Sequence, residues 1–391
     1  MKIDLFNEIQ DRKPWADDHE QRGFRHAIEQ AKLADELGYG CWWQVEHHGA
    51  EEFSLSSAPE LLLAALSQQT SRIRLGHSAV LAPGRFNHPI RIAERAATLD
   101  HLSGGRLELG LTRSTGPEWR LFNIDPDAAR PQTTQAFEML PKMWTEDRFS
   151  YQSDDYQIND VRISPKPLQR PHPPLWQAAA SPASFEEAGK RGVGVLGTTM
   201  WESLGRAGRM IDLYRAAAGQ CTRPVGATVN NQVAFFTFVH CAATDEEAML
   251  NGAAAAAAWY TVTALTFFEA AEVFVRTLRE QQELLNTPGG GGLTGQFLRE
   301  EAADPPSEAQ LLIARIIQGE PVADDEVFTV LNAQDSLIVG SPETCRRKLA
   351  AYADLGIDRM MCMQQIGGIE HSKVLDSIRL IGDLIPELDV G

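Results

Sequence analysis

The 391-residue chain is short of cysteine and of positive charge, and both shortages exclude classes of protein. Its five cysteines are widely spaced and form no Cys-x-x-Cys pair, so neither a disulfide framework nor a structural zinc site is expected. The 36 basic and 53 acidic residues give a formal net charge of −17, which argues against a protein whose basic face binds nucleic acid. A reducing cytoplasm is therefore the expected compartment.

The sequence also lacks a segment typical of a membrane or secreted protein. Its first residues carry many charged side chains, which leave no room for the apolar core of a signal peptide. One uncharged stretch, residues 249–268, is long enough to span a bilayer, but a run of alanines and several polar residues make it only weakly apolar. We expect no membrane contact and a buried or cavity-lining helix at 249–268.

Apolar runs that are typical of strands alternate with helical segments along the chain. The runs are 2–6, 41–45, 73–81, 107–111, 174–179, 193–197, 231–242 and 359–364. This alternation indicates βαβ units, whose parallel strands are joined by right-handed crossovers. The first run is not followed by the glycine fingerprint of a doubly wound sheet, so an α/β fold closed into a (β/α)8 TIM barrel is favoured. We expect one such domain over residues 1–391.

Residues 286–306 break this regular pattern with four consecutive glycines between acidic and proline-rich flanks. A segment of this length and composition inside a compact domain is either disordered or a mobile lid. It falls between the seventh and eighth predicted strands and should emerge near the C-terminal rim, where barrel active sites lie. We favour a mobile lid over a disordered insertion.

Two adjacent histidines, His47 and His48, follow Glu46 at the end of the second predicted strand. Successive strand side chains point to opposite sides, so the two histidines are not expected to bind one metal ion. The first predicted strand also lacks the His-x-His element of metal-dependent hydrolase barrels, so no metal site is expected. A lone histidine is more often structural than catalytic, but the C-terminal tip of a barrel strand favours a function.

Two further strand tips carry groups that could bind an anion. Arg113, between Thr112 and Ser114, could bind a phosphate through its planar fork or could make a salt bridge on the rim. Ser181 and Ser184 lie at a strand-to-helix junction that could form an anion site, although Ser181 could also be only a helix N-cap. The tips together favour a phosphorylated cofactor.

On these elements the chain resembles the bacterial luciferase-like flavin-dependent monooxygenases. The resemblance covers residues 1–197 and 338–364 and rests on WQVEHH, TSRIRLGHSAVLAP, NHPIRIAERAATLDHLSGGRLELG, PKPLQRPHPP and IVGSPETCRRKLAAYADLGIDR. It implies a barrel that binds reduced FMN (FMNH2) in its C-terminal mouth and oxygenates a small organic substrate with O2 through a flavin C4a-(hydro)peroxide. A separate flavin reductase would supply the reduced FMN, because the chain has no nicotinamide-binding fingerprint.

The resemblance also implies roles for individual residues. It makes His47 the catalytic residue that directs the hydroperoxide, and it places a non-proline cis peptide beneath the flavin ring at Ser78–Ala79. The cofactor-binding residues that it implies are Glu46, Ser78, Ala79, Thr112, Arg113, Ala180, Ser181 and Ser184. Thr112 departs from the cysteine of luciferases, so no reactive thiol is expected there.

Two alternatives stay open at this point. A relative of the same barrel class uses a deazaflavin to transfer hydride without oxygen, and some barrels of the family are non-catalytic flavin-binding subunits. Aromatic residues near the rim segments favour either an apolar pocket or simply a core. We expect substrate selectivity to lie in residues 202–333 and a homodimer to form through barrel helices.

Overall fold

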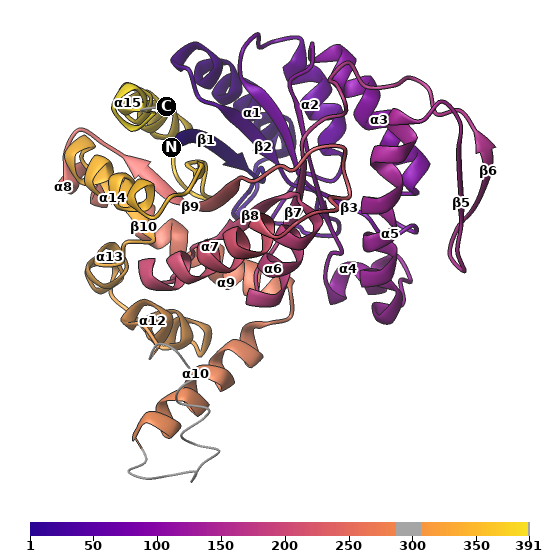
Figure 1. Cartoon of the computed structure of the whole chain (residues 1–391). Helices are drawn as coiled ribbons and strands as arrows, with labels where there is room; N and C mark the ends of the chain where they lie inside the picture. The colour runs from indigo at the N-terminus through magenta and orange to yellow at the C-terminus, as the bar shows by residue number, and fades with distance from the viewer. Residues whose placement is uncertain (287–305, 390–391) are drawn as a thin grey trace.

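The computed structural model describes residues 1–286 and 306–389, and its centre is a closed barrel of parallel strands (Figure 1). The barrel strands are β1 (Lys2–Asn7), β2 (Cys41–Gln44), β3 (Arg74–Leu81), β4 (Leu107–Thr112), β7 (Leu175–Ala178), β8 (Gly194–Thr198), β9 (Val233–Cys241) and β11 (Arg359–Met363). They pair in this order, and β11 pairs with β1 to close the sheet. The predicted (β/α)8 barrel is confirmed, because the eight expected runs coincide with these strands to within two residues.

Helices cover the outside of the barrel and connect its strands (Figure 1). They are α1 (His19–Leu37), α2 (Pro59–Ser67), α3 (Pro89–Leu102), α4 (Gly116–Leu121), α5 (Pro126–Thr145), α6 (Pro182–Arg191), α7 (Leu204–Gly219), α8 (Asp245–Leu250), α9 (Ala253–Phe267), α10 (Ala271–Asn286), α12 (Glu308–Ile317), α13 (Asp324–Asn332), α14 (Pro342–Asp354) and α15 (His371–Leu388). The two ends of the chain meet, since the Met1 amino group donates to the Leu388 carbonyl at 3.0 Å.

Three short strands were not predicted. β5 (Phe149–Gln152) and β6 (Gln157–Val161) form an antiparallel hairpin beside the barrel, and their mostly exposed residues give no apolar run. β10 (Leu337–Gly340) is apolar but only four residues long, and it pairs with the C-terminal part of β9 outside the closed ring.

Buried polar side chains fill the barrel interior toward the N-terminal ends of its strands. Arg359 donates to both carboxylate oxygens of Asp4, at 3.1 and 3.2 Å. The Trp43 indole donates to Asp4 at 2.8 Å, and the Trp176 indole donates to Glu108 at 2.7 Å. Because this end is filled by bonded side chains, a ligand has access to the interior from the C-terminal mouth.

Most of the uncharged stretch 249–268 forms α9, whose alanines are mostly buried, which confirms the predicted buried helix, whereas residues 249–250 end α8. None of the helices in residues 1–286 and 306–389 has the length and apolarity needed to cross a bilayer. The predicted lid at 286–306 lies outside the described residues except for its two ends.

Candidate active site

The predicted site residues lie in or just after the C-terminal halves of four neighbouring strands, β2, β3, β4 and β7. All pairings among the barrel strands are parallel, so these ends open on the same mouth. Leu81 of β3 pairs with Thr112 of β4, and Leu111 of β4 pairs with Gln177 of β7. The segments that follow β3, β4 and β7 therefore leave the barrel side by side.

His47 lies just beyond β2, where a carboxylate and three aromatic rings hold its imidazole. Its Nδ1 atom is 3.4 Å from Oε1 of Glu118 on α4. The rings of Phe53, Phe267 and Phe268 lie with their centroids 5.2 to 5.7 Å from the imidazole. With the Glu118 carboxylate as acceptor, Nδ1 carries a hydrogen, and Nε2 has no hydrogen-bond partner among the described residues. Nε2 is thus the atom left to interact with a ligand.

Glu118 is a buried carboxylate that ties the start of α4 to the end of β2. It accepts a hydrogen bond from the His48 backbone N–H at 2.9 Å and another from the Ser114 hydroxyl. Burial acts to raise the pKa of Glu118, but the hydrogen bonds and the positive potential of His47 outweigh burial and lower it below the ordinary value. The carboxylate is therefore ionised at neutral pH and can orient the His47 ring.

Glu46 binds four groups that belong to the strand ends around it. It accepts from the Asn87 amide at 2.8 Å and the Leu81 backbone N–H at 3.1 Å. Nε2 atoms of His48 and His77 each lie 3.3 Å from its carboxylate. Burial acts to raise the pKa of Glu46, but hydrogen bonds from His48 and Asn87 and the positive potential of His77 hold it far below the ordinary value. Glu46 therefore links β2 to β3, and its contact with a flavin stays a prediction.

A buried carboxylate that we did not predict, Glu8, follows β1 at the same mouth. The Tyr260 hydroxyl of α9 donates to its Oε1 atom at 3.1 Å, and the Gln10 amide donates to Oε2 at 3.1 Å. Burial raises the pKa of Glu8 to about 7, although the nearby His47 acts to lower it. The position of Glu8 directly after the first predicted strand is the signal that could have identified it.

Arg113 and the start of α6 occupy the ends of β4 and β7. Arg113 is exposed, stacks over Trp119 at 5.4 Å from the ring centroid, and has no ion pair within the described residues. Ser181 is the N-cap of α6, and the Ser184 hydroxyl accepts from the backbone N–H groups of Ser181 at 2.9 Å and Ala180 at 3.2 Å. Ser181 is therefore a helix N-cap, and a role of this exposed helix start in anion binding stays a prediction.

The non-proline cis peptide predicted at Ser78–Ala79 is present, and Thr112 is the half-buried last residue of β4. The cis peptide lies where the register between β3 and β4 shifts. A side chain at the neighbouring Gly110 would approach the Ala79 Cβ to 3.1 Å and the His77 carbonyl to 2.9 Å. Glycine at this position lets β3 and β4 approach closely beside the cis peptide.

These groups fit a phosphorylated flavin mononucleotide. An exposed guanidinium with no carboxylate partner in the described part of the chain and the exposed first turn of a ten-residue helix stand on adjacent strand ends, and both attract a phosphate. On the same mouth, His47 presents a nitrogen without a partner beside a wall of phenylalanines. Among the described residues no group of three or more His, Cys, Asp or Glu side chains is placed to bind a metal ion.

Comparisons with known proteins agree with this geometry. The chain is 34% identical over 171 residues to the oxygenase component of a flavin-dependent trigonelline monooxygenase from Acinetobacter baylyi, covering 43% of this chain and 46% of that protein. It is 29% identical to an FMNH2-dependent dimethylsulfone monooxygenase of Pseudomonas putida, over 48% of this chain and 50% of that protein. It is also 29% identical to an F420-dependent glucose-6-phosphate dehydrogenase of Amycolatopsis mediterranei, over 46% of this chain and 55% of that protein. The chain thus spans about half the length of the curated relatives it matches.

The fold extends further than these sequence matches. The crystal structure of the monooxygenase RslO1 from Streptomyces bottropensis superposes with a TM-score of 0.72 over 99% of both chains, at 23% identity. The family model for luciferase-like monooxygenases matches residues 10–359, which is most of the chain. The chain therefore belongs to the luciferase-like monooxygenase family.

Proposed function

We propose that this protein is the oxygenase of a two-component flavin monooxygenase, which uses reduced FMN and O2 to oxygenate a small organic substrate. The observation that carries the proposal is the pair formed by His47 and the ionised Glu118, on the same barrel mouth as the unpaired Arg113. The names of the trigonelline and dimethylsulfone relatives support both the flavin and the reaction class.

Arg113 and the first turn of α6 would hold the flavin phosphate. A guanidinium binds phosphate with two parallel hydrogen bonds, and a helix start adds backbone N–H groups and a favourable dipole. The flavin ring would then lie over Ser78–Ala79. Glu46, Thr112 and Ala180 would be further contacts of the cofactor. When bound, reduced FMN supplies the electrons that activate O2.

His47 would exchange a proton with the reacting group through Nε2. Glu118 fixes the hydrogen on Nδ1 and so sets the tautomer, which is how a carboxylate makes a histidine an effective acid or base. Glu8, with a pKa of about 7, can hold or release a proton near His47 at neutral pH. Phe267 and Phe268 restrict water around the imidazole and favour an apolar substrate.

A separate flavin reductase is the expected partner, because the chain has no nicotinamide-binding fingerprint and one relative is named as an oxygenase component. We also propose a homodimer, the commonest symmetric assembly of soluble proteins. Retention of His47 and Arg113 argues against a non-catalytic flavin-binding subunit.

The second candidate is hydride transfer with a deazaflavin, which the F420-dependent relative favours. Oxygen consumption separates the two candidates. Anaerobically reduced FMN is mixed with the protein and then with O2, and both flavin reoxidation and H2O2 release are followed. A monooxygenase retards reoxidation relative to free FMN and releases less than one H2O2 per flavin when a substrate is present. Reoxidation as fast as that of free FMN, together with substrate-dependent reduction of F420, would replace the proposal by the second candidate.

A further inference from the structure

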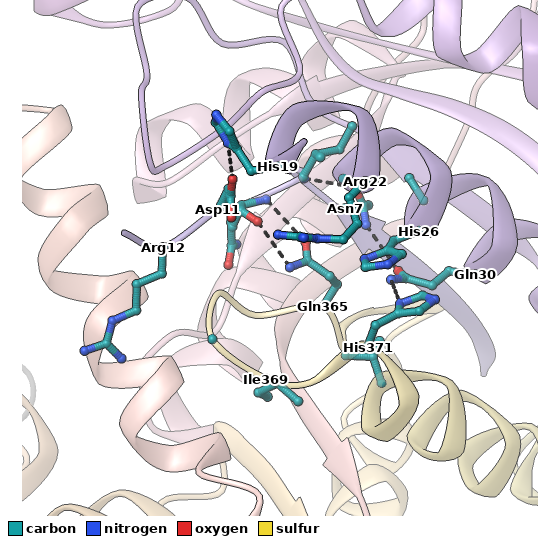
Figure 2. A pocket seen from close by; sticks show the side chains of 16 residues that line it. Asn7, Asp11, Arg12, His19, Arg22, His26, Gln30, Gln365, Ile369 and His371 are labelled. Atoms are coloured by element: carbon teal, nitrogen blue, oxygen red, sulfur yellow. Dashed lines mark hydrogen bonds and ion pairs between the residues drawn. The ribbon is translucent and has the colours of Figure 1, made fainter. Parts of the chain in front are cut away.

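A second pocket lies outside the barrel wall, between α1, α15 and the loops that follow β1 and β11 (Figure 2). It has a volume of about 250 Å³. Asn7, the last residue of β1, and Glu8, which follows it, point to opposite sides of the barrel wall. The Asn7 amide contacts Gln30 of α1 at 3.5 Å, whereas Glu8 contacts Tyr260 at the barrel mouth. The pocket thus lies on the outer side of the barrel wall, beside the mouth, since Gln10 in its lining also donates to Glu8, and the proposed flavin chemistry places no ligand in it.

Basic and imidazole side chains outnumber carboxylates in the lining of this pocket, although the net charge of the chain is −17. Its basic and imidazole side chains are Arg12, Arg22, His19, His26 and His371. The only carboxylate among the residues that line it is Asp11, which already pairs with His19. Arg12 has no carboxylate partner in the described part of the chain and lies over Trp259, 5.9 Å from the ring centroid. Arg22 pairs with Asp18 at 2.9 Å, so Arg12 is the group that favours an anionic ligand.

Two stacked histidines form one side of the pocket. The rings of His26 and His371 are parallel, with centroids 3.6 Å apart. His371 uses both nitrogens, since Nε2 lies 3.0 Å from Glu29 and Nδ1 lies 3.4 Å from Gln30. His26 has no hydrogen-bond partner among the described residues, and burial together with His371 lowers its pKa. A bound anion would accept a hydrogen bond from His26 and would favour the protonated form of its ring.

Figure 2 places His26, Gln30 and His371 together on one side of the pocket and Arg12 on the opposite side. The two cationic or potentially cationic groups that lack hydrogen-bond or ion-pair partners, Arg12 and His26, therefore lie apart rather than at one point. A ligand that uses both needs two separated anionic groups. A dicarboxylate meets this requirement, while a single small ion does not.

The backbone and the apolar lining of the pocket are consistent with a ligand site. Ile9 has a φ of 53°, which is strained for a β-branched residue, and its N–H donates to Asn7 Oδ1 at 3.0 Å. Such residues cluster at ligand-binding and switch regions, where the surrounding structure holds them. Ile9, Ile369 and Val374 add apolar surface, which suits an organic ligand body better than an inorganic ion.

We propose that this pocket binds a small organic dicarboxylic acid through Arg12 and His26, with its hydrocarbon body against Ile9, Ile369 and Val374. The volume of about 250 Å³ lies below the roughly 300–1,000 Å³ of sites for drug-sized ligands, which excludes a nucleotide or a second flavin. The proposal does not rest on the proposed flavin site.

Calorimetric titration of the full chain with succinate, without flavin, tests the proposal. We expect one succinate per chain. Arg12→Gln and His26→Gln should each weaken its affinity by about tenfold or more, since each removes a charge-assisted hydrogen bond. Arg25→Gln is the matched control, because Arg25 is exposed on α1 next to His26 and does not line the pocket. Its affinity for succinate should stay within about twofold of that of wild type.

Thermal melting of each variant separates lost binding from lost folding, and the exposed position of Arg12 makes Arg12→Gln the safer variant. The proposal is overturned if succinate gives no binding heat, or if both variants bind it as wild type does. Inorganic phosphate that binds as tightly as succinate would overturn the dicarboxylate assignment. Because no flavin is present in these titrations, their failure leaves the monooxygenase proposal unaffected.

Discussion

The Tyr260 hydroxyl donates a hydrogen bond to the Glu8 carboxylate at 3.1 Å, and both side chains are buried. This bond joins the end of β1 to α9, although the two residues are 252 positions apart in the chain. The end of α9 carries Phe267, whose ring lies against His47. The contact therefore fixes the helix that forms the apolar side of the proposed active site.

Replacement of Glu8 tests the pKa of about 7 through protein stability. The ordinary pKa of 4.5 describes the unfolded carboxyl group, so between pH 4.5 and about 7 the folded protein holds more protons than the unfolded chain. Stability is consequently lost as the pH rises through this window. The free energy of unfolding of Glu8→Gln, relative to that of wild type, should therefore be higher near pH 8 than at about pH 4. We expect this increase to reach up to roughly 3 kcal/mol.

Urea unfolding of both proteins at the two pH values measures this change, and the pH dependence of the difference is the readout. Glu246→Gln, at an exposed position of α8, should show no such dependence. A difference between Glu8→Gln and wild type that is the same at both pH values would show that Glu8 titrates normally.

Loss of the His47 imidazole should affect turnover more than flavin binding. A positioned acid or base typically contributes about 10²- to 10⁴-fold to rate, so we expect His47→Asn to reduce product formation by this order. The affinity for reduced FMN should change by less than about threefold. Single-turnover product yield and flavin fluorescence measure the two effects. His101→Asn, at an exposed position on α3, is the control, and a His47→Asn enzyme with normal turnover would contradict the assigned role.

Glu118 acts on the reaction through His47, so its replacement should change the pH profile. Glu118→Gln removes the negative charge beside Nδ1 and, because its amide can also donate to that atom, no longer fixes the hydrogen on Nδ1. We expect turnover to fall by about tenfold or more and the shape of the pH–rate profile to change. A purely structural role would reduce activity equally at every pH. The profile of wild type measured in parallel distinguishes the two results.

Replacement of Arg113 tests the phosphate site with a built-in control. Arg113→Gln should weaken FMN binding by about 10- to 100-fold, because it removes a charge-assisted contact to the phosphate. Riboflavin has the same ring without the phosphate, so its affinity should be unchanged. Arg120→Gln, at an exposed position on α4, controls for a general loss of positive charge. An equal loss for FMN and riboflavin would place Arg113 away from the phosphate.

Truncation of the aromatic wall should impair coupling of O2 use to product. Phe267→Ala opens the side of His47 to water, and we expect the fraction of reducing equivalents lost as H2O2 to rise by about twofold or more. Phe267→Leu keeps most of the apolar volume and should stay near wild type. H2O2 and product are measured together in the same reaction. Unchanged coupling in Phe267→Ala would remove this ring from the water-excluding wall.

The barrel could be predicted because its strands are nearly continuous apolar runs, which is what burial on both faces demands. The same signal is absent from the exposed β5–β6 hairpin and is too short in β10. His47 could be proposed from its place at a strand tip and from the family resemblance. Whether it is the catalytic residue depends on the experiments above.

The partners of the site residues were harder to predict. Glu118 reaches His47 across 71 positions through the fold of α4, and no local pattern distinguishes it from other exposed-looking acids. Glu46 stands in a recognisable motif, yet the structure shows it bonded to the ends of β2 and β3. Such contacts depend on tertiary packing, which local sequence patterns do not encode.

The central claim is that one barrel mouth places the flavin phosphate at Arg113 and the start of α6, with the ring facing His47. A crystal structure of the protein with FMN tests it most directly. We predict the phosphate within hydrogen-bonding distance of the Arg113 guanidinium and the first turn of α6, and the ring above Ser78–Ala79. A flavin bound elsewhere, or oriented with its phosphate away from Arg113, would contradict the account.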